Sequence, residues 1–167
     1  DAVIDLGRNN RRFKDAYLSG GVYLGGTAAA NKLDDYEEGT WTPGLSGSIT
    51  AGDTTYTRAV GWYTKIGQEV RFRGRVTVNL QGTLNGNVSL TGLPFTPSTT
   101  TDSYGNLSIS YAKSLSITAS ESLCGYVNVG TTSAFFQVWN SIFGVAAFDD
   151  AELTNGADFI FTGSYSV

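Results

Sequence analysis

Side chains that carry out most enzymatic chemistry are scarce in this sequence. It contains no His and a single Cys, Cys124. A Ser-His-Asp or Cys-His catalyst, a His-ligated zinc site and an internal disulfide are therefore excluded within this chain. Cys124 follows Leu123 in an apolar stretch, where we expect a buried and unreactive thiol. We expect no cofactor.

Carboxylates are the remaining candidates for acid–base chemistry, and they gather in two places. Residues 33–38 carry four acids, and a second group comprises Asp149, Asp150, Glu152 and Asp158. Two carboxylates could cleave a glycan as acid and base, and an oxygen-rich run could bind Ca²⁺. The spacing of an EF-hand is absent, however, and adjacent acids are usually solvated. We therefore expect no catalytic residue and no metal site, and a linker over residues 33–38 with room for one helical turn. A glycan depolymerase is the enzymatic alternative.

Three places in the second half of the chain set an aromatic ring beside amide side chains. An aromatic ring can cover the apolar face of a sugar while neighbouring polar groups bond its hydroxyls. The candidates for such binding are Tyr104 with Asn106, Tyr126 with Asn128, and Trp139 with Gln137. The alternative for each ring is a place in a core or interface, since aromatic residues dominate both.

Charge is distributed unevenly along the chain. All 11 Lys and Arg lie within residues 1–113, whereas residues 114–167 hold five acids and no base. Because phosphate contacts need clustered Lys and Arg, we expect no nucleic-acid partner. The arginines of residues 8–12 and 71–75 have acids nearby, which indicates solvated or salt-bridged faces. No apolar run reaches about 18 residues, so we expect no membrane insertion.

Strands must position these side chains. Gly, Ser and Thr supply 57 of the 167 residues and aromatics a further 13%, a composition that favours strands over helices. Residues 69–80 alternate between apolar and polar side chains, the period of a half-buried strand. Gly67-Gln68 joins them to a second strand over residues 56–66. Strand signals recur at intervals of about 8–12 residues, which predicts an antiparallel β-sandwich or jelly roll.

Several connections can be predicted as well. Asn85-Gly86 is typical of a type I′ hairpin, and residues 93–101 contain two prolines, which indicates a loop. Asn155-Gly156 predicts a turn into the last strand. We expect one short helix over residues 148–152.

Residues 1–32 differ from the rest of the chain. Their two apolar pieces, residues 16–18 and 22–24, are too short to build a core. Their large apolar side chains must therefore pack on the main domain or on other copies of the chain: Phe13, Tyr17, Leu18, Tyr23 and Leu24. We predict a stalk over residues 1–32 and a β-sandwich head over residues 33–167. Because the chain begins with Asp1, we expect it to be part of a longer product.

Several segments resemble proteins of tailed bacteriophages. Residues 5–7 with 12–21 are similar to a segment common in fibre and appendage proteins. Residues 31–43 resemble the opening of a C-terminal domain of tail-fibre and virion-structural proteins. Residues 61–70 and 89–95 match motifs that follow in such domains. The resemblance covers residues 5–95 well and the remainder loosely, and its motifs are structural.

The resemblance implies a distal tail-fibre domain of the virion. It implies a homotrimer, with other virion tail proteins as partners and a host-surface glycan or outer-membrane receptor as target. The aromatic and amide candidates are then the expected receptor-binding residues, and the apolar side chains of residues 1–32 the expected oligomer interface. Trp41 and Trp62 lie in the family-like segments, so we assign them to packing. The alternative is a purely structural virion protein: a head fibre, a decoration protein or a tail adaptor.

Overall fold

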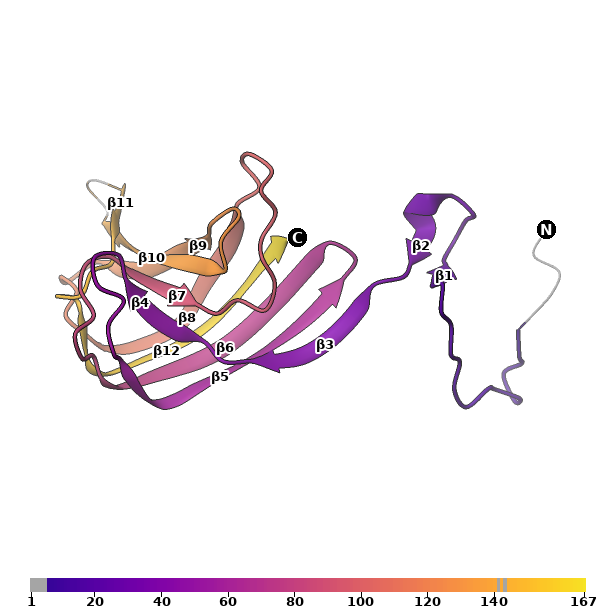
Figure 1. Cartoon of the computed structure of the whole chain (residues 1–167), viewed down its shortest axis with the longest axis horizontal. Coiled ribbons are helices and arrows are strands. Elements are labelled where there is room, and N and C mark those ends of the chain that lie inside the picture. The colour runs from indigo at the N-terminus through magenta and orange to yellow at the C-terminus, as the bar shows by residue number, and fades with distance from the viewer. Residues whose placement is uncertain (1–5, 141, 143) are drawn as a thin grey trace. The chain divides into compact units, whose positions relative to one another are not determined.

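The computed structural model describes residues 6–140, 142 and 144–167. The chain divides into two compact units, residues 1–35 and residues 36–167. The second unit, here called the β body, contains ten strands, all paired antiparallel (Figure 1). In chain order they are β3 (Tyr36–Trp41), β4 (Gly44–Gly47), β5 (Thr55–Ile66), β6 (Glu69–Leu80), β7 (Val88–Thr91), β8 (Gly105–Leu115), β9 (Ser122–Val127), β10 (Ser133–Asn140), β11 (Gly144–Ala147) and β12 (Leu153–Ser166).

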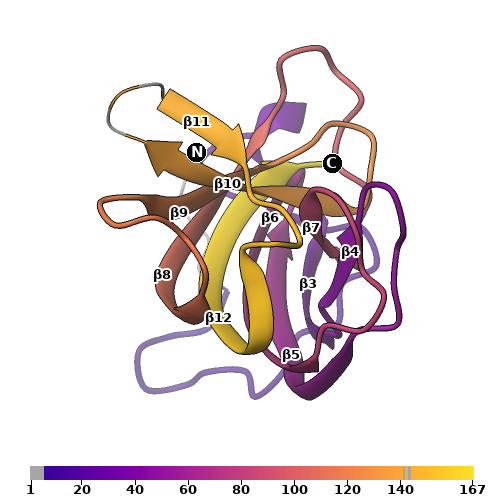
Figure 2. The same cartoon turned by 90° about the vertical axis from the view of Figure 1, so that its left-hand side faces the viewer.

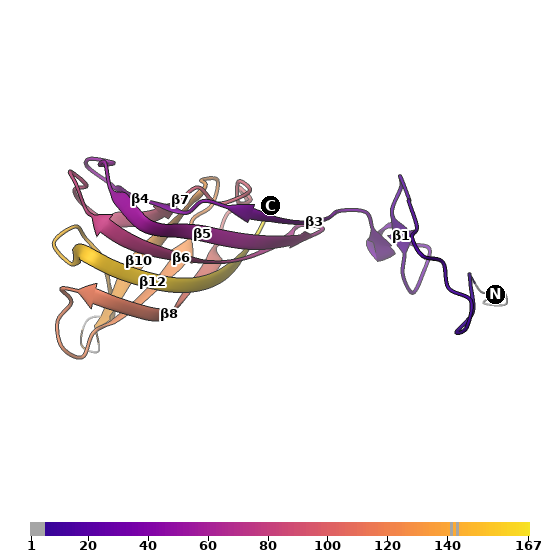
Figure 3. The ribbon, with the colours of Figure 1, turned by 90° about the horizontal axis from the view of Figure 1, so that it is seen from below.

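The ten strands form one sheet rather than two. Their order is β3-β5-β6-β12-β8-β9-β10-β7-β4, with β11 paired to β10. Figure 3 shows β5, β6, β12 and β8 side by side in one wall. Register shifts in the β5–β6 and β8–β12 ladders mark bulges, which bend and twist strands.

The sheet curls strongly into a half-barrel, as the view in Figure 2 shows. Although β8 and β9 separate β10 from β12 along the sheet, the rings of Phe136 and Phe159 stack across the interior at 5.3 Å between centroids. The prediction of an antiparallel all-β fold is confirmed. The two-sheet sandwich or jelly roll is corrected to a single curled sheet, because curling lets one sheet enclose its own core.

Alternate residues of the long strands build that core. In β6 the predicted apolar face is buried at Val70, Phe72, Val76 and Val78, which confirms the period of two up to Val78, whereas Leu80 at the end of the strand is 52% exposed. The largest fully buried side chains include five phenylalanines from four different segments: Phe72, Phe136, Phe148, Phe159 and Phe161. These side chains belong to one continuous hydrophobic core.

Two predicted turns are wrong. Asn85-Gly86 does not close a hairpin, because β6 and β7 are not neighbours in the sheet; Asn85 instead forms an isolated bridge with Thr50. Asn155-Gly156 lies inside β12 at a register shift against β8. Gly156 adopts a positive φ of 82° there, so the Asn-Gly pair makes a bulge rather than a turn.

Two predicted helical segments are also corrected. Residues 148–152 form a turn, in which the carboxylate of Glu152 accepts the backbone N–H of Asp149 at 2.9 Å and Asp149 accepts that of Ala151 at 2.9 Å. These bonds cap N–H groups that have no partner inside a helix, but the chain enters β12 at Leu153, so no further helical turn follows. In the acidic run, Tyr36 to Glu38 already belong to β3, where they pair with β5.

The first unit is the smaller of the two. It contains β1 (Val22–Tyr23) paired with β2 (Lys32–Leu33), and a short 3₁₀ turn, η1 (Ala29–Asn31). Among its described residues, 6–35, none is buried. Its described large apolar side chains are exposed, Tyr17 at 93%. In the described part of the whole chain, no helix has the length and apolar character needed to cross a membrane.

Candidate functional site

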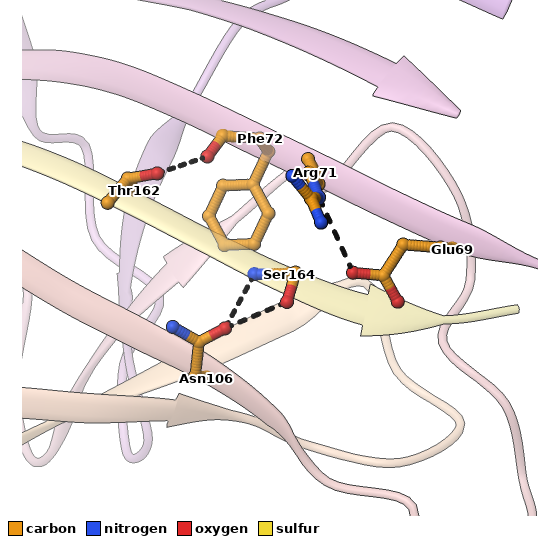
Figure 4. Close-up of polar contacts among 6 residues, drawn as sticks. All are labelled: Glu69, Arg71, Phe72, Asn106, Thr162 and Ser164. Atoms are coloured by element: carbon orange, nitrogen blue, oxygen red, sulfur yellow. Dashed lines mark hydrogen bonds and ion pairs between the residues drawn. The ribbon is translucent and has the colours of Figure 1, made fainter. Parts of the chain in front are cut away.

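The outer face of the half-barrel carries the side chains that alternate with the core. Because hydrogen-bonded partners on adjacent strands share a face, the register aligns six outward residues in one row across six strands. Here called the outer row, it runs Thr64, Arg71, Ser164, Asn106, Tyr126 and Phe135. Figure 4 shows Arg71, Ser164 and Asn106 within it.

An aromatic cluster occupies the β8–β10 end of the outer row. The ring of Tyr104, just before β8, meets Tyr126 edge-on at 5.8 Å between centroids. Tyr126 stacks on Phe135 at 5.6 Å and 25°. Tyr104 is 56% exposed, and Tyr126 and Phe135 are half-buried. Mutual packing therefore holds the rings in place while the Tyr104 ring faces solvent, as a stacking surface for a ligand requires.

Asn106 lies beside this cluster with a fixed orientation. Its Oδ1 accepts two hydrogen bonds from Ser164, one from the backbone N–H at 2.8 Å and one from the hydroxyl at 3.0 Å (Figure 4). The side-chain carbonyl is thus engaged, and the Nδ2 donors have no acceptor among the described residues. Asn106 can therefore donate to a ligand hydroxyl without rearranging.

The structure brings together only part of the predicted receptor-binding set. Tyr104, Asn106 and Tyr126 meet on the outer face. Gln137 lies further along β10, opposite Cys124 and Ala147, and points the same way as Phe135. Phe135 itself is missing from the predicted set. Its adjacent neighbour Phe136 is buried, and only the strand register shows which ring faces out.

The structure places the remaining two members of the predicted set differently. Trp139 is 52% exposed, but it lies four positions beyond Phe135 along β10, about 13 Å at the usual rise per residue. Asn128 follows the end of β9, where its backbone N–H bonds Ser133 across a turn at 3.3 Å. Trp139 is therefore distant from the aromatic cluster, whereas Asn128 is one position past the Gly105–Val127 pair and lies opposite Tyr104 in the same register.

The two assignments to packing have different outcomes. Trp41 is buried and meets Phe72 edge-on at 5.9 Å, so it is a core residue as predicted. Trp62 is 45% exposed on the outer face, and the Arg73 guanidinium lies over its ring at 5.6 Å from the centroid. The packing assignment of Trp62 is therefore wrong.

The candidate carboxylates hold the fold together. Asp158 is buried and accepts hydrogen bonds from Arg75 Nε at 2.9 Å, Arg75 Nη2 at 2.6 Å and Thr77 Oγ1 at 2.9 Å. The hydrogen bonds from Arg75 are the main cause that lowers the pKa of Asp158. Asp150 accepts the backbone N–H of Gly86 at 2.7 Å. Burial is the main cause that raises the pKa of Glu152, which bonds its own turn.

The acidic run and Cys124 have similar structural settings. Asp34 is paired with Lys32 at 2.9 Å, and Glu37 and Glu38 accept hydrogen bonds from the hydroxyls of Tyr63 and Tyr36. No three His, Cys, Asp or Glu side chains of the described residues gather as a metal site would require. Cys124 is half-buried rather than fully buried, and desolvation raises the pKa of its thiol, which disfavours the reactive thiolate.

No protein-family model matches the chain, and no curated protein matches it. Among solved structures, the crystal structure of the Dettilon tailspike protein (gp208) matches with a TM-score of 0.66 at 18% identity. The match covers 78% of this chain and 24% of the tailspike, so the chain spans about a quarter of that protein. The fold described above is therefore shared with part of that tailspike protein.

Proposed function

We propose that this chain is a domain of a bacteriophage tail appendage that binds the host cell surface as part of the virion. The observation that carries the proposal is the fold shared with the tailspike at a TM-score of 0.66. The resemblance of residues 5–95 to fibre and appendage proteins points the same way from sequence alone.

The aromatic cluster with Asn106 is the surface we assign to the host receptor, a glycan. Tyr104 offers an exposed ring and Asn106 offers fixed donors. An apolar ring face with directed polar groups beside it suits a pyranose, which has an apolar face and a rim of hydroxyls. The surface is open and its rings are held in place, so binding would not require the side chains to become ordered first.

The first unit is the part we assign to assembly. Phe13, Tyr17, Leu18, Tyr23 and Leu24 are all exposed. Single exposed apolar residues are common, but five large ones within so short a unit favour burial between chains. We propose that three copies associate here as a homotrimer, alongside other virion tail proteins, and display three β bodies.

We further propose that the domain binds without cleaving. Its buried carboxylate, Asp158, is tied to Arg75 and Thr77. In the group of residues 149–152, side-chain oxygens bond backbone amides of the fold. A glycosidase needs two carboxylates that face one sugar across about 5–9 Å. The carboxylates of Asp158 and of residues 149–152 instead form hydrogen bonds that stabilise turns and strand pairing.

The proposal is tested by labelling host cells with the fluorescent chain and by measuring competition with phage adsorption. We expect the wild-type chain to label cells and slow adsorption. The Tyr104→Ala variant should reduce both by about tenfold, the loss expected when one well-placed binding ring is removed. Tyr111→Ala is the matched control. Tyr111 is a tyrosine of similar exposure, at 44%, and it lies on β8 outside the aromatic cluster. A chain that neither labels cells nor competes would favour the purely structural virion protein.

A further inference from the structure

A groove on the outer face lies beside the other end of the outer row. It has a volume of about 540 Å³, and its lining includes Glu38, Trp62, Thr64, Arg71, Arg73 and Thr162. These residues come from β3, β5, β6 and β12, which are adjacent in the sheet. The groove therefore stands on paired strands rather than on loops, and its side chains have fixed relative positions.

The two arginines set the charge of the groove. Arg71 and Arg73 are two residues apart on β6, so they project from the same face. Arg71 is paired with Glu69 at 3.9 Å, and both side chains are exposed to water, so the pair contributes little. With Glu38 as the acid in the lining, the groove carries a formal charge of +1 from two arginines and one carboxylate.

The arrangement of Trp62 and Arg73 adds a stacking surface to this charge. The Arg73 guanidinium lies 5.6 Å from the Trp62 ring centroid, a cation–π distance that orients the guanidinium. Thr64 and Thr162 flank the arginines across the sheet. The Thr162 hydroxyl donates to the carbonyl of Phe72 at 3.1 Å (Figure 4), which leaves its oxygen as an acceptor.

We propose that this groove binds a hexuronic acid residue of an acidic host polysaccharide. A carboxylate can take a bidentate hydrogen bond from a guanidinium, the sugar ring can stack on Trp62, and its hydroxyls can bond the threonines and Glu38. The charge of +1 complements one carboxylate per sugar. This inference rests on the proposed function and names the class of glycan.

The geometry links the groove to the aromatic cluster. From Arg71 on β6, the outer row crosses β12 and β8 to reach Tyr126 on β9. Three steps between neighbouring strands span about 14 Å. One extended oligosaccharide lying across the strands can therefore place an acidic sugar on the arginines and another sugar on the tyrosines, with Asn106 between them.

The test is calorimetric titration of the whole chain with two acidic probes, a hexagalacturonate and a hyaluronan hexasaccharide. The controls are the same oligosaccharides with their carboxylates methyl-esterified. We expect at least one acid form to bind, its ester to bind at least tenfold more weakly, and affinity to fall with added salt. Arg71→Gln and Arg73→Gln should each weaken binding about tenfold, the effect of one hydrogen bond to a charged group.

The matched control for the arginine variants is Arg58→Gln, because Arg58 is an exposed arginine of β5 that does not line the groove. Its binding should equal that of the wild type. The inference is overturned if neither acid form binds, if acid and ester bind equally, or if R58Q weakens binding as much as R73Q. It is also overturned if R73Q changes the mass in light scattering, since the face would then join copies of the chain. Cell labelling that depends on Tyr104 but not on Arg73 would remove this inference and leave the proposed function intact.

Discussion

The two units of the chain place their aromatic side chains in opposite environments. In the β body, Phe72, Phe136 and Phe159 are buried inside the curled sheet. In the first unit, Phe13 and Tyr17 are exposed, and none of the described residues 6–35 is buried. The β body thus contains the interactions that stabilise its own fold, whereas the first unit presents apolar surface that a partner could cover.

This difference separates two kinds of stability. Burial of apolar surface within one chain is independent of protein concentration, but burial between chains depends on mass action. The same substitution should therefore have different consequences in the two units, and the comparison can be tested with matched variants.

The largest expected effect is that of Phe159→Ala. Phe159 is fully buried, with 0% of its surface exposed, and its ring meets Phe136 and Phe148. Truncation should lower the free energy of unfolding by about 3–5 kcal/mol. The matched variant Phe13→Ala should change the unfolding of the β body by less than about 0.5 kcal/mol. Urea denaturation followed by tryptophan fluorescence measures both, and equal losses would contradict the comparison.

The next largest effect should come from Asp158→Ala. The substitution removes the acceptor of two Arg75 bonds and one Thr77 bond. The expected loss is about 2 kcal/mol, less than for a fully buried pair because Arg75 is partly exposed to water.

The same carboxylate gives a pH dependence with a defined sign. The pKa of Asp158 is lowered in the folded state, chiefly by the Arg75 hydrogen bonds. Its contribution is therefore present above the unfolded pKa of about 3.9 and is lost as the pH falls through the lower folded value. Urea midpoints measured between neutral and strongly acidic pH should decline less steeply in Asp158→Ala than in the wild type. Identical declines would show that Asp158 makes no such contribution.

A smaller effect is expected from Tyr165→Phe. The buried Tyr165 hydroxyl accepts from the N–H of Phe95 at 3.1 Å and donates to its carbonyl at 3.0 Å, which anchors the proline-containing loop. Loss of these bonds should cost about 1 kcal/mol. Burial raises the pKa of Tyr165 to about 12. Wild-type stability should therefore fall as pH rises from about 10 toward that value. The variant should lack this part of the fall in alkaline denaturation, and an unchanged alkaline profile would contradict the assignment.

The long strands could be predicted from sequence because their pattern is local. Residues 69–80 alternate strictly, and the structure places β6 at those bounds. The sheet order could not be predicted, since β12 enters between β6 and β8 from the far end of the chain. The turns predicted at the Asn-Gly pairs are wrong for the same reason. Each has the conformational freedom of a turn, but the long-range pairing partners decide whether a turn or a bulge forms.

The candidate site likewise contains contacts that follow from local sequence and others that depend on the register of the sheet. Tyr104, Asn106 and Tyr126 meet because β8 and β9 are neighbours in sequence and in the sheet. Trp62 and Tyr63 are adjacent, so sequence alone could not show which ring faces the core. The register of β5 against β6 decides it: Tyr63 pairs with the buried Phe72, and Trp62 pairs with Arg73.

We propose that the exposed apolar side chains of the first unit are buried between copies of the chain. The most direct test is the molecular mass of the protein in light scattering. The account predicts about 53 kDa, three chains of 17.8 kDa each. It also predicts a shift toward single chains when Tyr17 and Tyr23 are both replaced by Ser, with the urea midpoint of the β body unchanged. A wild-type chain that stays at 17.8 kDa at high concentration would contradict it.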